Sequence, residues 1–162
     1  MAEVVSDDEF RETLARYATG VVVLTAHTDE YGDVGSTVTS FCSVSAEPPL
    51  VVASIGTFSR MFDTLDMQPL WAVSVLGAEQ RHVAGRFAVP ARPGGGVLLT
   101  GVAHHRGART GAFVLDDALA AFECRTTQRV EAGDHTLFVG EVLAVDRLGN
   151  GEPLLRFAHG YR

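Results

Sequence analysis

Apolar side chains recur along this chain at spacings that predict several strands separated by short helices. The clearest run, Val21–His27, is β-branched and almost continuously apolar, which is typical of a strand covered on both faces. Further strands are predicted at Leu50–Ile55, Trp71–Leu76, Ala118–Val130, His135–Arg147 and Pro153–Phe157.

A different pattern appears in Ser36–Ser45, which alternates like a strand although six of its ten residues carry a hydroxyl. Each hydroxyl buried in a core needs a partner or costs free energy, so this is not a core strand. It is either a solvated surface strand or a strand of small residues whose backbone a flat, polar, polycyclic ligand can approach. The pair Pro48–Pro49 ends the strand, because proline lacks a backbone donor.

Three stretches have the spacing of short amphipathic helices. The first begins at a capping box on Ser6, and its apolar residues Phe10, Leu14 and Tyr17 extend it to about Ala18. The second follows Ser59 and carries an apolar side at Met61, Phe62 and Leu65; the third covers Glu79–Phe87. The residues of Thr28–Asp33 predict a turn, and those of Pro90–Gly96 predict a loop. A further segment, Val97–His105, follows this loop and precedes the two long strands.

Most of these strands are connected by turns, so the sheet is predicted to be mainly antiparallel. A closed or nearly closed barrel hides the most strand edges. The sequence therefore predicts a mainly β protein, a β-barrel with two or three short peripheral helices, forming a single domain over residues 1–162.

Charge and composition narrow the possible functions. A net charge of −7 and a pI near 5.3 argue against nucleic acid and against an anionic membrane surface as partners. The two cysteines, Cys42 and Cys124, are too far apart in sequence for a zinc-binding motif or a disulfide framework. No signal peptide and no membrane-spanning run is visible, so the expected location is the cytoplasm.

The segment Ser54–Arg60 combines a strand end, a glycine turn and a helix start. Free backbone N–H groups and the helix dipole favour an anion there, with Ser59 as the N-cap. Ser54, Thr57 and Arg60 add donors suited to a phosphate. An ordinary helix cap beside an exposed arginine is the simpler interpretation. No phosphate-binding or dinucleotide-binding glycine motif is present, so a Rossmann-type site is unsupported.

Histidines offer few other candidate sites. His135 follows a Gly-Asp turn and begins an alternating strand, which is typical of a surface histidine; its functional interpretation is a donor or cation beside a bound ligand. His104 and His105 are adjacent on a strand and face opposite ways, so they do not form a metal site. Since no nucleophile or metal cluster is evident, a redox role requires a borrowed cofactor.

These stretches, in their order and spacing, resemble the flavin reductase family, whose members have a flavin-binding split barrel. The resemblance runs nearly from end to end and rests on Ala18–Thr25, Gly35–Ser45, Pro48–Val51, Ala72–Leu76, Ala84–Ala88, Gly133–Val142, Pro153–Leu155 and Gly160–Tyr161.

The resemblance implies roles for individual residues. The strand containing Gly35, Ser36, Thr37, Thr39 and Ser40 contacts the isoalloxazine ring of the flavin. The ribityl phosphate is held by the segment comprising Ser54, Ile55, Gly56, Thr57, Ser59 and Arg60. A loop that flanks the flavin corresponds to Arg86, Phe87 and Ala88. His135 lies beside the nicotinamide, and Tyr161 is near the same groove.

Two positions depart from the family pattern. Thr39 stands where many members have Asn, which removes an amide that pairs with the flavin and leaves the choice between FMN and FAD open. Gly111–Phe113 stands where Gly-x-Pro is common, so the path of the loop before it is not carried over.

The implied activity is an NAD(P)H:flavin oxidoreductase that passes a hydride from NADH or NADPH to N5 of FMN or FAD. The implied assembly is a homodimer that supplies reduced flavin to a partner monooxygenase. Two alternatives are a flavin-binding electron carrier that ignores NAD(P)H, and an oxidase or tailoring enzyme that retains its flavin while acting on an organic substrate.

Overall fold

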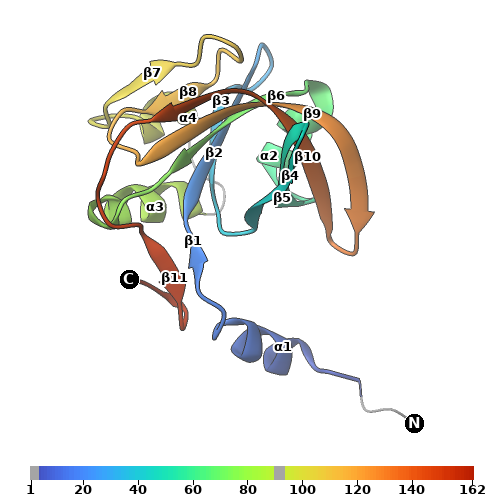
Figure 1. Cartoon of the computed structure of the whole chain (residues 1–162). Helices are drawn as coiled ribbons and strands as arrows, with labels where there is room; N and C mark the ends of the chain where they lie inside the picture. Colours follow the sequence, from blue (N-terminus) through green and yellow to red (C-terminus); the bar gives the residue numbers. More distant parts are fainter. Residues whose placement is uncertain (1–3, 90–93) are drawn as a thin grey trace.

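The computed structural model describes residues 4–89 and 94–162. Its main feature is a seven-stranded sheet in the order β3-β2-β6-β9-β10-β5-β4, in which every neighbouring pair is antiparallel (Figure 1). The strands are β2 (Val22–Thr28), β3 (Gly32–Val38), β4 (Phe41–Ala46), β5 (Pro49–Gly56), β6 (Leu70–Val75), β9 (Ala120–Ala132) and β10 (His135–Arg147). The predicted mainly β, antiparallel architecture is confirmed.

Strands β3 and β4 form the two opposite edges of the sheet. They follow each other in the chain and are connected by only two residues, Thr39 and Ser40, so the sheet must curl to bring its edges together. The prediction of one continuous strand over Ser36–Ser45 is therefore wrong. β3 pairs with β2 whereas β4 pairs with β5, so the chain must leave one edge of the sheet and enter the other at this point. The backbone N–H of Ser54 donates to the carbonyl of Ser40 at 3.1 Å and fastens the break to β5.

Strand β2 is covered on both faces, as its continuous apolar run predicts. Val22, Leu24 and Ala26 point into one core cluster with Trp71 and Phe138, inside the barrel. Val23 on the other face, together with Val21, contributes to a second cluster outside the barrel, formed with the third helix and the short strand β8 (Phe113–Leu115). The sequence pattern therefore correctly indicates two layers of packing around one strand.

The predicted helix starts are confirmed. Ser6 forms a capping box with Glu9 at the start of α1 (Asp7–Leu14), and the hydroxyl of Ser59 accepts from the N–H of Phe62 in α2 (Arg60–Met67). The third predicted helix is a 3₁₀ turn, η1 (Ala78–Gln80), that continues into α3 (Arg81–Ala88).

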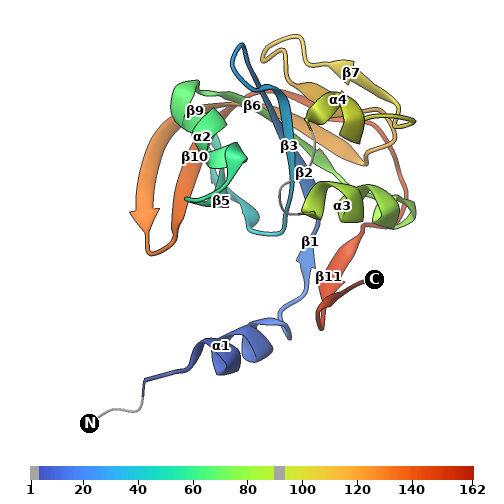
Figure 2. The same ribbon diagram turned by 180° about the vertical axis from the view of Figure 1, so that it is seen from behind.

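Helix α1 stands apart from the barrel, and none of its residues is buried (Figures 1 and 2). It ends at Leu14 rather than near Ala18, since the N–H groups of Arg16 and Tyr17 donate to the carbonyls of Thr13 and Leu14 in tighter turns. The carbonyl of Ala15 accepts from the N–H of Ala158. Phe10, Leu14 and Tyr17, the predicted apolar side, are all exposed. No helix in the described ranges is long and apolar enough to cross a membrane.

Other differences lie between residues 94 and 115. Residues 90–93 of the predicted loop Pro90–Gly96 lie outside the described residues. From Gly95 the chain forms a short fourth helix, α4 (Gly95–Leu98), where the loop was predicted to continue. Leu98 and Leu99 are buried in the outer core cluster, which explains why this apolar segment folds as a turn of helix. Strand β7 (His104–Arg106) contains the predicted His104–His105 pair and is paired with β8, a strand that was not predicted from the sequence.

The loop between β7 and β8 is anchored by one carboxylate. An oxygen of Glu123 accepts from the N–H of Arg109 at 2.9 Å and from the N–H and hydroxyl of Thr110 at 2.7 and 2.8 Å. This is the loop whose path could not be carried over from the family. The carboxylate of Glu123 on β9 therefore holds this loop in place, since it accepts three hydrogen bonds from it.

A third sheet, of three short strands, pairs the segment that follows α1 with the C-terminal strands. It has the order β1-β11-β12, with β1 (Thr19–Gly20), β11 (Leu155–Phe157) and β12 (Gly160–Tyr161). As a result, the C-terminal strands lie beside the segment that follows α1 (Figure 1).

Candidate functional site

The strand break at Thr39–Ser40 is the point at which two predicted binding stretches meet. Both residues are exposed, in contrast to the buried Val38 that precedes them. The hydroxyl of Ser40 donates to the carbonyl of Ser54 at 2.9 Å, which complements the Ser54 N–H bond to Ser40. The end of β3 and the end of β5 are therefore held side by side.

The segment after Ser54 has fewer free donors than its sequence suggests. The hydroxyl of Ser59 caps α2 and also donates to the carbonyl of Gly56 at 2.8 Å. Both the N–H and the hydroxyl of Thr57 donate to the carbonyl of Asp134. Ile55 faces the barrel core. The anion-binding capacity of this segment thus rests on the first-turn N–H groups of α2 that Ser59 does not bind and on Arg60, which is exposed.

Next to Arg60, the side chain of Phe58 is fully exposed. Sequence reasoning did not single it out, because a lone apolar residue in a turn gives no signal of its burial. An exposed aromatic ring beside a candidate phosphate site is suited to stacking against a ligand or packing against another protein.

His135 begins β10 directly opposite Gly56. Its Nδ1 lies 2.7 Å from the carboxylate of Asp134, and this hydrogen bond lowers the pKa of Asp134. A Cβ on Gly56 would have the Nε2 of His135 as its nearest neighbour, at 3.8 Å. The structure therefore brings His135 to the segment predicted to hold phosphate, and half of its side chain remains exposed.

The other predicted flavin contacts on β3 face the protein. Gly35 is buried, and a Cβ there would lie 2.6 Å from the ring of Phe87. The hydroxyl of Thr37 donates to the carbonyl of Ala84 at 2.6 Å, which ties β3 to α3. Ser36, one residue earlier, is half-buried on the opposite face of the strand. Gly35 and Thr37 thus build the fold and leave Thr39 and Ser40 as the accessible pair.

The predicted flanking loop, Arg86–Ala88, is the last turn of α3. Phe87 is fully buried in the outer core, so its ring has no surface that a ligand in this chain can contact. Arg86 donates to the carbonyls of Leu98 and Thr100 at 3.1 and 2.8 Å and holds α4 in place. Arg86 and Ala88 are exposed whereas Phe87 is buried, so the role of this segment beside a flavin stays a prediction that involves Arg86 and Ala88 rather than the Phe87 ring.

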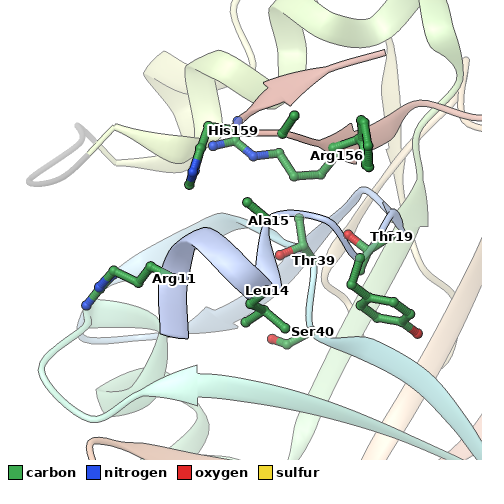
Figure 3. A pocket seen from close by; sticks show the side chains of 11 residues that line it. Arg11, Leu14, Ala15, Thr19, Thr39, Ser40, Arg156 and His159 are labelled. Atoms are coloured by element: carbon green, nitrogen blue, oxygen red, sulfur yellow. The ribbon is translucent and has the colours of Figure 1, made fainter. Parts of the chain in front are cut away.

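A cavity of about 510 Å³ opens beside Thr39 and Ser40 (Figure 3). Its other walls come from α1 with the segment behind it, and from the turn between β11 and β12. Arg156 on β11 and His159 in the turn after it line the cavity, and neither was predicted from the sequence. Tyr161 is not part of the lining; its ring lies under the guanidinium of Arg156, 5.1 Å from centroid to Cζ.

Two kinds of reactive group, metal-ligand clusters and cysteine thiols, can be examined among the described residues. Within residues 4–89 and 94–162 no group of three or more His, Cys, Asp or Glu side chains is arranged to hold a metal ion. Burial raises the pKa of the Cys124 thiol to about 12, so this sulfur is protonated at neutral pH and is a poor nucleophile.

Comparison with known proteins identifies the family. The model of the flavin reductase-like domain matches residues 14–162. An NADH-dependent FAD reductase of Streptomyces globisporus is 37% identical over 147 residues, which cover 91% of this chain and 80% of the relative. The reductase component of a 4-hydroxyphenylacetate 3-monooxygenase from Thermus thermophilus is 36% identical and covers 96% of this chain and 95% of its own length.

Solved structures agree. BorF, the flavin reductase component of a bacterial two-component tryptophan halogenase, superposes with a TM-score of 0.90 at 35% identity, and the match covers 97% of each chain.

One sequence relative is longer than this chain. A probable flavin reductase of Rhizobium meliloti is 33% identical, and the chain spans only 49% of that protein. The chain belongs to the flavin reductase-like family, and the resemblance inferred from its sequence is confirmed.

Proposed function

We propose that this chain is the reductase component of a two-component monooxygenase system. It oxidises NADH or NADPH, reduces FMN or FAD, and releases the reduced flavin to a partner oxygenase. The activity class, an NAD(P)H:flavin oxidoreductase, is that of its named relatives. One observation carries the proposal: the exposed Thr39–Ser40 break is bonded to Ser54, where the segment leading to Arg60 begins.

The described residues fit a flavin. Thr39 and Ser40 are small, polar and exposed at a gap in the sheet, so a flat ring can approach their backbone. Arg60 has no ion pair with a carboxylate among the described residues, and its charge is available to a phosphate. When bound, the flavin supplies the redox chemistry by accepting a hydride at N5.

The chain contributes alignment rather than acid–base catalysis. Hydride transfer needs two rings held in contact at the correct angle, and a displacement of about 1 Å costs roughly a hundredfold in rate. The hydrogen bonds between Ser40 and Ser54 fix the wall against which one ring lies. We assign His135 to the nicotinamide donor, since its exposed ring edge is the free part of the pair that it forms with Asp134.

We also propose that the active form is a homodimer. Phe10, Leu14 and Tyr17, on and beside α1, are apolar and exposed in the described part of the chain, and Leu14 and Tyr17 also line the cavity. Exposed apolar patches of this kind mark interaction sites. Sedimentation equilibrium should give twice the mass of the chain, and the double variant Phe10→Glu/Leu14→Glu should give the mass of one chain.

We expect the protein to act as one domain over residues 1–162 in the cytoplasm. Both cysteines are free, Cys42 at the surface and Cys124 in the core. Free thiols are usual in a reducing compartment.

The decisive test is steady-state oxidation of NADH and NADPH with FMN, FAD or riboflavin added. We expect rapid oxidation only when flavin is supplied, with saturation in flavin as for a substrate. Flat nicotinamide absorbance with every flavin would contradict the reductase and favour a flavin carrier. Turnover by tightly retained flavin, without any dependence on added flavin, would favour an oxidase or tailoring enzyme.

A further inference from the structure

The cavity beside the Thr39–Ser40 break has a cationic wall that the proposed flavin and phosphate contacts do not use. Figure 3 shows Arg156 and His159 on one side of the cavity and Thr39 with Ser40 below them. The whole chain carries a net charge of −7, so a concentration of positive charge at one cavity stands out against its background. A cleft lined by one sign of charge raises the local concentration of ligands of the opposite sign.

Three basic side chains line this cavity, and their partners distinguish them. Arg11 donates to Asp7 at 2.7 Å, and His159 lies 3.2 Å from the carboxylate of Glu12. Arg156 has no carboxylate partner in the described part of the chain. Arg156 is a half-buried residue, and its guanidinium lies instead over the ring of Tyr161. Arg156 is thus a positioned cation whose charge is not compensated by the protein.

The turn that carries this wall adopts an unusual backbone. Ala158 and His159 are consecutive non-glycine residues with φ of 48° and 60°, in the left-handed region. Residues with a Cβ adopt this conformation only when the surrounding structure enforces it, and such residues gather at ligand sites. Here the N–H of Ala158 donates to the carbonyl of Ala15 at 2.8 Å, so the turn is tied to the opposite wall of the cavity.

We propose that this cavity binds the pyrophosphate of a dinucleotide through Arg156, and that Tyr161 is a positioning residue for that arginine. The inference rests on the proposed reductase function, which makes the hydride donor, NADH or NADPH, the occupant. A cavity of about 510 Å³ is within the usual range for small-molecule sites, roughly 300–1,000 Å³. A donor whose phosphates lie at Arg156 can direct its nicotinamide toward Thr39 and Ser40 across the same cavity.

FAD also contains a pyrophosphate and an adenylate, so it is the alternative ligand whose pyrophosphate could occupy this cavity. The two are separated by comparing FMN, which has neither group, with FAD as the flavin. If the cavity serves the donor, loss of Arg156 weakens NADH with FMN and with FAD alike. If it serves FAD, only FAD is affected.

The test compares Arg156→Gln with wild type. With FMN as acceptor, we expect KM for NADH to rise about tenfold or more, kcat to change by less than about twofold, and the FMN Kd to stay the same, since a lost charge-assisted bond weakens binding by about this factor. Arg147→Gln, which removes an exposed arginine outside the cavity, is the matched control and should leave all three unchanged. Arg156→Lys keeps the charge and should restore part of the loss, which excludes misfolding as the cause.

Tyr161 supplies a readout that a merely structural role would not move. Tyr161→Phe keeps the ring beneath Arg156 and should leave KM for NADH unchanged, whereas Tyr161→Leu should raise it with kcat preserved. Binding of NAD⁺ to the flavin-free protein, measured by calorimetry, should weaken in Arg156→Gln by the same factor as KM.

Three results would overturn the proposal: an unchanged KM for NADH in Arg156→Gln, unchanged NAD⁺ affinity, or a loss confined to FAD. Failure of the reductase function would look different. In that case wild type itself would not oxidise NADH, while Arg156-dependent binding of NAD⁺ in the calorimeter would still support the cavity as a dinucleotide site.

Discussion

The two parts of one hydroxyl-rich stretch have opposite fates. Gly35 and Thr37, on β3, are packed and hydrogen-bonded against α3. Thr39 and Ser40, a few residues later, are exposed at the break between the edge strands and line the cavity. Residue chemistry is similar in both parts. What separates them is whether another element covers the strand, so the first part maintains the fold and the second can meet a ligand.

The largest effect should come from breaking the covered part. Phe87→Ala empties a fully buried site and should lower the free energy of unfolding by about 3–5 kcal/mol. Phe58→Ala is the matched control, because its ring is fully exposed, and should change stability by less than about 0.5 kcal/mol. Urea unfolding of both variants measures the difference. Similar losses in the two would mean that α3 does not pack against β3 as described.

Gly35→Ala tests the close approach of β3 to α3. The added Cβ would meet Phe87 at 2.6 Å and Phe113 at 3.2 Å, and the buried Phe87 ring has little room to move. Overpacking of this kind should cost about 1–3 kcal/mol. Gly85→Ala, in α3 with no atom within 4 Å of the new Cβ, should instead be neutral or stabilise by up to about 1 kcal/mol. The reverse order of thermal midpoints would refute the packing argument.

Arg60→Ala tests whether the exposed region beside Thr39 and Ser40 binds the phosphate of a flavin. A shielded charge-assisted hydrogen bond contributes roughly 1.5–3 kcal/mol, so the Kd for FMN should rise tenfold or more while the Kd for riboflavin, which lacks phosphate, should hardly change. Fluorescence titration of both flavins measures this, with Arg147→Ala as the control for lost surface charge. Equal losses for FMN and riboflavin would show that Arg60 does not contact the phosphate.

The smallest effect on stability is expected for His135→Ala, since this side chain is half exposed on a hairpin. If His135 positions the nicotinamide, stopped-flow reduction of bound flavin should slow or KM for NADH should rise, with the flavin Kd unchanged. Wild-type kinetics would return His135 to the role of an ordinary surface residue.

The same variant has a pH signature. The hydrogen bond from His135 lowers the pKa of Asp134 in the folded state. Its stabilising contribution is therefore present above the unfolded pKa of Asp134 and is lost as the pH falls through the folded value. In His135→Ala the pKa of Asp134 should move up toward its ordinary value, which an NMR titration of the carboxyl detects. An unmoved titration curve would mean that the pair is not formed in solution.

The local pattern determined much of this protein. The continuous apolar run of Val21–His27 indicated a strand buried on both faces, and Ser6 and Ser59 marked two helix starts, because these features depend on neighbours within a few residues. The alternation of His135–Arg147 gave the bounds of β10. The order of such motifs along the chain was enough to identify the family.

Only the tertiary structure decided which of the matching residues are accessible. The break at Thr39–Ser40 exists because β3 and β4 pair with different strands, and the burial of Gly35 depends on Phe87, far away in sequence. Likewise, the left-handed turn at Ala158–His159 is held by a bond to Ala15 that no local pattern encodes, since Ala and His do not favour that conformation on their own. Contacts between distant residues thus turned a hydroxyl-rich stretch into one covered half and one open half, and placed Arg156 beside the open half.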